Sequence, residues 1–324
     1  MRSDQRQFLI FDLEIATRKD GAPPPTMDTV VSIWQNAKDQ NQAYEINTGS
    51  ASMLIGDIRA EAAEDHVTLL VRLSDKKAPN SVYSKLTTNS FVEHEKDDDT
   101  GSDLGCHVIV SRVQEANRPN IYTCAVERIS GMPSALVKRM LSKFLHTEFK
   151  QVATSFQYPA PGGGLDKNGL PRMERCCPHI ELRGRASEEF ISDLEQGVLL
   201  GVKLVKTETV TPMTGAAYLV RDSSELKLQV VQNNLPAHIW NSLKSMLNTY
   251  SQDYWKSVVS YKLPNSKRIV TVDIENETGS PLKELYIQQF EIMNIFPPLA
   301  QSSQVIVTRL RDAALPLFLS HRTI

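Results

Sequence analysis

Apolar and polar residues alternate over several short segments of the chain, and this pattern is typical of half-buried β-strands. In the first half it predicts strands over 8–16, 52–61, 66–73, 106–113 and 121–128. The last two flank a turn-like stretch at 116–120, so we expect them to form a hairpin. In the second half the same pattern predicts strands over 179–183, 198–210, 217–231, 268–274 and 304–310.

Apolar residues spaced three and four apart predict helices between these strands. The clearest helix of the first half begins at Pro133, whose fixed φ suits a first helical turn, with Ser130 as a candidate cap. Its apolar stripe consists of Leu136, Met140, Leu141, Phe144 and Leu145. Further helices are predicted over 27–37, 187–194, 237–258 and 282–295.

These elements predict an α+β protein in which antiparallel sheet and helices are assembled into two domains. Residues 1–158 are expected to form an antiparallel sheet with helices on one side. The Gly- and Pro-rich stretch 159–171 is expected to be a flexible linker. Residues 172–265 then form a second, smaller α+β domain that is basic, rich in strands and closed by a long helix. Residues 266–324 form a strand-helix-strand segment whose packing partner the sequence leaves open.

The composition of the 324 residues is that of a globular protein, with 41% hydrophobic residues and a net charge of −2. Asp12 and Glu14 interrupt the first apolar stretch, which therefore does not resemble a signal peptide. No apolar run reaches the length of a membrane span. The four cysteines are too few for a disulfide framework. We expect a soluble, cytoplasmic protein.

Two carboxylates in the first strand are the strongest candidates for catalytic chemistry. Asp12 and Glu14 lie on one face of the strand, and Asp-x-Glu on a strand is the first motif of the DEDD exonucleases, which bind Mg²⁺ through it. The later aspartates that complete such a metal site are missing. The simpler interpretation is an amphipathic strand with Leu9, Phe11 and Leu13 on its other face. A metal-dependent nuclease using Asp12 and Glu14 remains an alternative.

Other motifs that could carry chemistry are incomplete. Cys176, Cys177 and His179 lie close together, but a structural zinc site needs four ligands, typically in two separated pairs. Glu181 and Arg183 have the spacing of the Glu-x-Lys of restriction-type nucleases, but arginine stays protonated and is a poor base. The sequence contains no Walker A, Gly-x-Ser-x-Gly or HExxH motif. We therefore expect no catalytic residue, no metal and no cofactor.

The distribution of charge is more informative than its sum. Residues 134–186 contain nine arginines and lysines and only four acidic residues, whereas residues 93–103 form an acidic stretch that we expect to be an exposed loop. A basic segment in an otherwise acidic chain suits contacts with nucleic-acid phosphates. The candidate nucleic-acid-binding residues are Lys138, Arg139, Lys143, Arg172, Arg175, Arg183, Arg185, Lys203 and Lys206.

The order of these segments resembles that of the RexA family of phage-exclusion proteins. The resemblance is carried by 66–75 (HVTLLVRLSD), by 131–134 (GMPS) with its helix, by 180–186 (IELRGRA), by 226–230 (LKLQV) and by the strand 268–274. It covers most of the chain after about residue 60 and consists of order and spacing with few identities. The first 60 residues and the acidic stretch have no counterpart in it.

The resemblance implies a cytoplasmic effector of an anti-phage, abortive-infection system that binds double-stranded DNA without strong sequence preference. It also implies a homodimer and a membrane-protein partner encoded by a neighbouring gene. No catalytic residue transfers from the family, and the choice of DNA contacts above depends on charge alone. A third hypothesis is a module that senses a phage protein through the acidic stretch.

Overall fold

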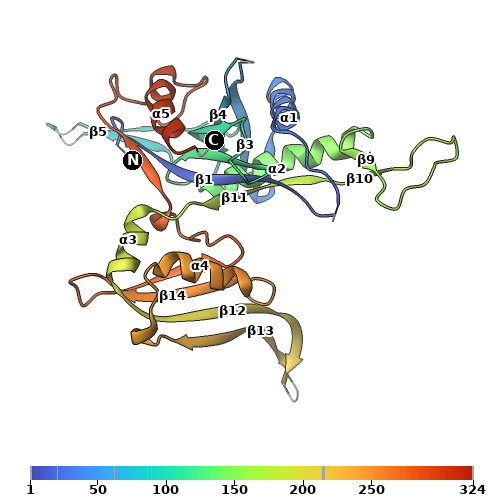
Figure 1. Ribbon diagram of the computed structural model, residues 1–324. Helices are drawn as coiled ribbons and strands as arrows, with labels where there is room; N and C mark the ends of the chain where they lie inside the picture. The colour runs from blue at the N-terminus through green and yellow to red at the C-terminus, as the bar shows by residue number, and fades with distance from the viewer. Residues whose placement is uncertain are drawn as a thin grey trace. The chain divides into compact units, whose positions relative to one another are not determined.

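The structure, a computed structural model, describes residues 2–19, 21–61, 63–85, 87–88, 90–213 and 216–322, and of the strand residues in 208–222 the backbone alone. The fold is α+β, as predicted, with a large antiparallel sheet and smaller sheets. The chain divides into two compact units (Figure 1). The larger unit comprises Met1–Phe8, Asp12–Leu182 and Phe290–Ile324, and the smaller unit comprises Leu9–Phe11 and Arg183–Gln289.

A large sheet forms the centre of the larger unit, with strand order β11-β1-β8-β7-β4-β3-β2 and with β16 paired to β1. Strands β2, β3, β4, β7 and β8 follow one another along the chain, and each pairs antiparallel with the next. The hairpin β5–β6 is inserted between β4 and β7. The strands are β1 (Arg6–Thr17), β2 (Tyr44–Ile46), β3 (Ala51–Arg59), β4 (His66–Asp75), β7 (Ser102–Ser111), β8 (Ile121–Glu127), β11 (Pro178–Gly184) and β16 (Gln289–Ile292). The predicted strands of the first half and their hairpin are thus confirmed.

Three helices belong to the larger unit: α1 (Met27–Asp39), α2 (Ser134–Gln151) and α5 (Thr308–Ser320). The predicted stripe of α2 is confirmed for Met140, Leu141, Phe144 and Leu145, which are buried, whereas Leu136 is only half-buried and the neighbouring Val137 is buried in addition. The N-cap of α2 is Pro133 and not Ser130, because Gly131 turns the chain with a φ of 91° before the helix begins.

The smaller unit contains an antiparallel sheet of strand order β13-β12-β14-β15. Its strands are β12 (Val198–Met213), β13 (Ala216–Gln229), β14 (Lys256–Lys262) and β15 (Ile269–Glu275), and its helices are α3 (Glu188–Gln196) and α4 (Ile239–Thr249). Phe190 and Trp240 from the helices share one core with Val202, Val259 and Val272 from the strands. The helices therefore cover one face of this sheet.

Three predicted elements in the second half are wrong. The helix over 237–258 ends at Thr249, and the residues after Trp255 form β14, in which every second side chain is buried. The helix over 282–295 is a short 3₁₀ turn followed by β16. The strand over 304–310 is wrong because Thr308 begins α5, which buries Leu310, Ala314 and Phe318 at helical spacing.

Two hairpins extend from the larger unit (Figure 1). Strands β9 (Gln157–Pro159) and β10 (Met173–Arg175) pair with each other, so the stretch predicted as a linker is the loop of an arm, residues 157–175. The compact units instead separate after Leu182 and after Gln289. Strands β5 (Ser81–Ser84) and β6 (Phe91–His94) form the second hairpin, which is exposed and leads into the acidic stretch.

Candidate functional site

The α2 helix and β11 line an open cavity of about 520 Å³, together with Arg18 just after β1, all within the larger unit. Its lining residues, which define the basic pocket, are Arg18, Tyr44, Lys138, Arg139, Ser142, Lys143, His146, Cys177, Pro178, His179, Ile180 and Glu181. Four arginines and lysines thus surround one carboxylate. Three of the candidate DNA-binding residues, Lys138, Arg139 and Lys143, lie here, and the fold adds Arg18 to them.

Helical spacing explains why α2 can present these side chains together. Lys138, Ser142 and His146 are four residues apart, so they lie one above another on one side of the helix. Ser142 fastens this side to β11, because its hydroxyl donates to the Ile180 carbonyl at 3.2 Å and accepts from the Ile180 amide at 3.0 Å. The pocket is therefore bounded by two regular elements with direct hydrogen bonds between them.

In the part of the chain that the structure describes, one of the four cations of the pocket forms an ion pair with a carboxylate, and the other three do not. Lys138 Nζ lies 2.8 Å from Glu181 Oε2, so this lysine has a partner. Arg18, Arg139 and Lys143 are exposed, and among the described residues none of the three has an ion-pair partner. Three cations without a close ion-pair partner among the described residues therefore line one cavity, which favours an anionic ligand.

Two histidines with lowered pKa values line the same pocket. The pKa of His146 is lowered by burial and by the positive charges of Lys150 and Lys143. Burial also lowers the pKa of His179, although Glu181 opposes this shift. The Nδ1 atom of His179 is buried and has no hydrogen-bond partner among the atoms that the structure describes. A buried polar atom of this kind is normally satisfied by water or by a ligand.

Cys177 does not have the environment of a nucleophilic thiolate. Its Sγ atom lies 3.5 Å from His146 Nδ1, but burial raises the pKa of the thiol above its ordinary value. Cys176 packs against Ala22 and Tyr158 in a small apolar cluster. The described residues contain no group of three or more His, Cys, Asp or Glu side chains that could hold a metal ion.

The candidate carboxylates of β1 are also not assembled into a metal site in the described part of the chain. Asp12 is almost buried, and its Oδ2 atom lies 2.6 Å from Arg118 Nη2. A carboxylate in a close ion pair with arginine is held in place by that charge, as in many structural ion pairs. Glu181, the other candidate acid, is the partner of Lys138.

Two predicted DNA contacts lie on or beside the arm, away from the lining of the basic pocket. Arg175 donates to the carbonyls of Phe149 and Val152 at the end of α2 and to that of Ser155, so its guanidinium caps the helix. Arg172 is 67% exposed, and its Nη2 atom lies 4.0 Å from Glu174 Oε1. Of these two, Arg172 is the one whose charge faces solvent.

Four further predicted contacts, Arg183, Arg185, Lys203 and Lys206, belong to the smaller unit. Arg183 is only 14% exposed, and its Nη1 atom donates to Glu275 at 3.0 Å and to Glu277 at 3.3 Å. Lys203 pairs with Glu225 at 2.9 Å. Lys203 and Lys206 are three positions apart on a regular part of β12, so they lie on opposite faces of the sheet.

Arg183→Ala should therefore act on stability and not on nucleic-acid affinity. Removing the guanidinium leaves Glu275 and Glu277 without their shared donor and should lower the free energy of unfolding by about 1–3 kcal/mol. Urea unfolding followed by the fluorescence of Trp240 and Trp255, in a Trp34→Phe background, measures it. Arg268→Ala, at an exposed position of the same unit, is the matched control. Unchanged stability together with lost DNA binding would contradict this role.

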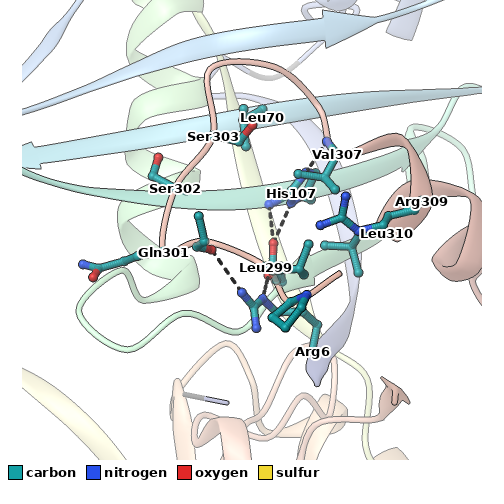
Figure 2. Close-up of a pocket in the computed structure, with 14 residues that line it drawn as sticks. Arg6, Leu70, His107, Leu299, Gln301, Ser302, Ser303, Val307, Arg309 and Leu310 are labelled. Atoms are coloured by element: carbon teal, nitrogen blue, oxygen red, sulfur yellow. Dashed lines mark hydrogen bonds and ion pairs between the residues drawn. The ribbon is translucent and has the colours of Figure 1, made fainter. Parts of the chain in front are cut away.

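A second cavity, of about 260 Å³, lies between the sheet of the larger unit and the segment 298–310 (Figure 2). Arg6, His107 and Glu127 form a buried network in its wall. Glu127 Oε1 lies 2.8 Å from Arg6 Nε, and Glu127 Oε2 lies 2.7 Å from His107 Nδ1. The amide of Val307 donates to His107 Nε2 at 3.1 Å, and Arg6 Nη2 donates to the Ala300 carbonyl at 3.2 Å.

This network holds the C-terminal segment on the sheet and does not form a catalytic triad. His107 Nε2 accepts a backbone N–H, so the imidazole proton is on Nδ1, facing Glu127, and Nε2 is not free to act as a base. The hydroxyls of Ser302 and Ser303 donate to Asp103 and to the Val305 carbonyl. No sequence motif indicated this cluster, because its members come from separate parts of the chain.

The sequence predicted three residues of the basic pocket, Lys138, Arg139 and Lys143, but not Arg18, Tyr44 or His146. The spacing of His146 from Lys138 and Ser142 was a signal that could have placed it on the basic side of α2. Arg18 and Tyr44 carried no such signal, because only the fold brings them to the helix.

Comparisons with known proteins give no information on the function of the basic pocket, so its function is inferred from its geometry. Among the residues that the structure describes, none of the helices combines the length and apolar character needed to cross a lipid bilayer. No protein-family model, curated protein or solved structure matches the chain.

Proposed function

We propose that this protein is a non-catalytic nucleic-acid-binding effector that contacts the phosphate backbone of duplex DNA through the basic pocket. The observation that carries the proposal is the convergence of Arg18, Arg139 and Lys143 on one cavity, in a chain of net negative charge, with no carboxylate partner among the described residues. Such an arrangement supplies the positive charges that contacts with phosphate need.

The physical basis of this binding is counterion release. Each phosphate neutralised by an arginine or lysine frees condensed cations from the DNA, which favours binding regardless of sequence. Arginine also donates two parallel hydrogen bonds to a phosphate, and the pocket offers Arg18 and Arg139 for this geometry. The attachment of α2 to β11 through Ser142 fixes the part of the helix that carries Arg139 and Lys143 before the ligand arrives.

The biological role that fits this activity is that of an anti-phage effector, and the resemblance of segment order to the RexA family supports it. We propose a homodimer, because two copies of the basic pocket on one duplex would raise the effective affinity. We also propose a cytoplasmic location and a membrane-protein partner encoded nearby. A pull-down from cells that express the neighbouring genes would identify that partner, and recovery of soluble proteins alone would contradict it.

Fluorescence anisotropy with labelled duplexes of about 20 base pairs tests the DNA-binding proposal. Two duplexes of unrelated sequence should bind with the same affinity, and both affinities should fall steeply as the salt concentration rises. Absence of binding at about 50 mM salt, where backbone contacts are strongest, would contradict the proposal.

Binding of a duplex with 5′-hydroxyl ends should also become severalfold stronger as the pH falls from about 7.5 to about 5.5. In the free protein the pKa values of His146 and His179 lie below the ordinary value for histidine. A phosphate beside them favours the protonated form and raises both pKa values, so the complex takes up protons that the free protein does not bind. Anisotropy titrations at several pH values measure the effect. The variant His146→Asn/His179→Asn should flatten the profile, whereas His94→Asn on the exposed hairpin should leave it unchanged. A profile of undiminished slope in the double variant would exclude these histidines as its source.

A further inference from the structure

We infer that the basic pocket recognises a nucleotide phosphomonoester, such as the 5′-phosphate at the end of a nucleic-acid strand, in preference to the internal phosphodiesters of a duplex. This inference rests on the proposed function and specifies its ligand. The first reason is shape, because a cavity of about 520 Å³ has the size of a small-molecule site. The backbone of a continuous strand can contact the exposed cations at the rim of such a cavity, whereas a chain end or a single nucleotide can also enter it.

The second reason is charge. A phosphodiester carries one negative charge, whereas a phosphomonoester carries between one and two at neutral pH and has one more anionic oxygen. Arg18, Arg139 and Lys143 provide three positive charges without an ion-pair partner in the described part of the chain. The dianion therefore gains more from this pocket than the monoanion does, and the difference is largest where solvent is partly excluded.

The third reason is the hydrogen-bonding capacity of the walls. His179 Nδ1 is buried and has no partner among the described atoms, although the imidazole forms part of the cavity lining. Burial and the positive charges of Lys150 and Lys143 lower the pKa of His146, which favours the uncharged imidazole as a hydrogen-bonding group. The imidazoles of His146 and His179 therefore add hydrogen-bonding groups to the wall of the cavity that holds the three cations.

The fourth reason is that the pocket is not polar throughout. Tyr44 contributes apolar surface beside the cations, whereas Pro178 and Ile180 are buried in the wall behind it. Tyr44 is half-buried on β2, where its ring can contact the sugar or the base of the first nucleotide. Cations with an adjacent aromatic ring suit a nucleotide better than inorganic phosphate.

The test compares two duplexes that share one sequence and an internal fluorophore and differ only in whether their 5′ ends carry phosphate or hydroxyl. We expect the phosphorylated duplex to bind about tenfold more tightly or better at moderate salt. AMP should displace it at concentrations where adenosine does not. If the protein binds AMP as tightly as it binds the phosphorylated duplex, the ligand of the pocket is a free nucleotide and not the end of a strand.

Variants connect the preference to the pocket. Arg18→Ala should reduce the ratio of the two affinities, whereas Lys77→Ala, at an exposed position outside the pocket, should not. Equal affinities of the wild-type protein for the two duplexes would overturn this inference and leave backbone binding intact. Binding of neither duplex at low salt would instead contradict the proposed function.

Discussion

Replacing Arg139 and Lys143 together by alanine should weaken binding to duplex DNA by roughly 50- to 100-fold at about 0.1 M salt. Both side chains are exposed on α2, and both line the basic pocket. Loss of two phosphate contacts removes the counterion release that each one drives. Alanine favours helix, so the fold of α2 should be retained. Anisotropy titrations of the variant and the wild type at the same salt concentration measure the loss.

The matched control removes two positive charges from elsewhere in the larger unit. Lys77 and Lys85 are exposed and do not line the basic pocket. The variant Lys77→Ala/Lys85→Ala should therefore change the affinity by less than about threefold, through long-range electrostatics alone. An equal loss in both double variants would show that net charge, and not the pocket, determines binding.

Glu127→Leu should lower the free energy of unfolding of the larger unit by about 3–5 kcal/mol. Arg6 and Glu127 are 3% and 2% exposed, and they form a close ion pair that also engages His107. Removing the carboxylate leaves a buried guanidinium uncompensated and deprives the His107 amide and imidazole of their acceptor. Urea unfolding followed by the fluorescence of buried Trp34, in a Trp240→Phe/Trp255→Phe background, reports on this unit.

Two further variants separate the ion pair from the general effect of a mutation. Glu95→Leu, at an exposed position, should change stability by less than about 0.5 kcal/mol. The double variant Arg6→Met/Glu127→Leu leaves neither charge unpaired, so it should be less destabilised than the sum of its single variants. Strict additivity of the two single effects would contradict a coupled buried pair.

The pattern of apolar residues within one segment predicted the strands and helices in which buried positions recur at the period of a strand or a helix. The strands of the first half and the apolar stripe of α2 were predicted because alternation and helical spacing are visible within one segment. The predictions failed at 282–295 and 304–310, where apolar runs are short and fit more than one period. There the tertiary structure decides, because β16 pairs with β1 and α5 buries Leu310 and Phe318.

The same distinction applies to the candidate site. Lys138, Arg139 and Lys143 were predicted from the sequence because they belong to the basic segment 134–186. Arg18 joins them through the packing of α2 against β11 and the end of β1, which no local pattern encodes. Conversely, Arg175 and Arg183 were counted as cations available to DNA. Sequence alone does not show that one caps α2 and the other is enclosed by Glu275 and Glu277.

The salt dependence of DNA binding tests the central claim most directly, because it counts the phosphate contacts that the protein neutralises. The logarithm of the binding constant should be measured against the logarithm of salt concentration for the wild type and for Arg139→Ala/Lys143→Ala. The account predicts a straight line for each protein, with the slope of the double variant smaller in magnitude by about two. Equal slopes for the two proteins would contradict the assignment of the phosphate contacts to the basic pocket.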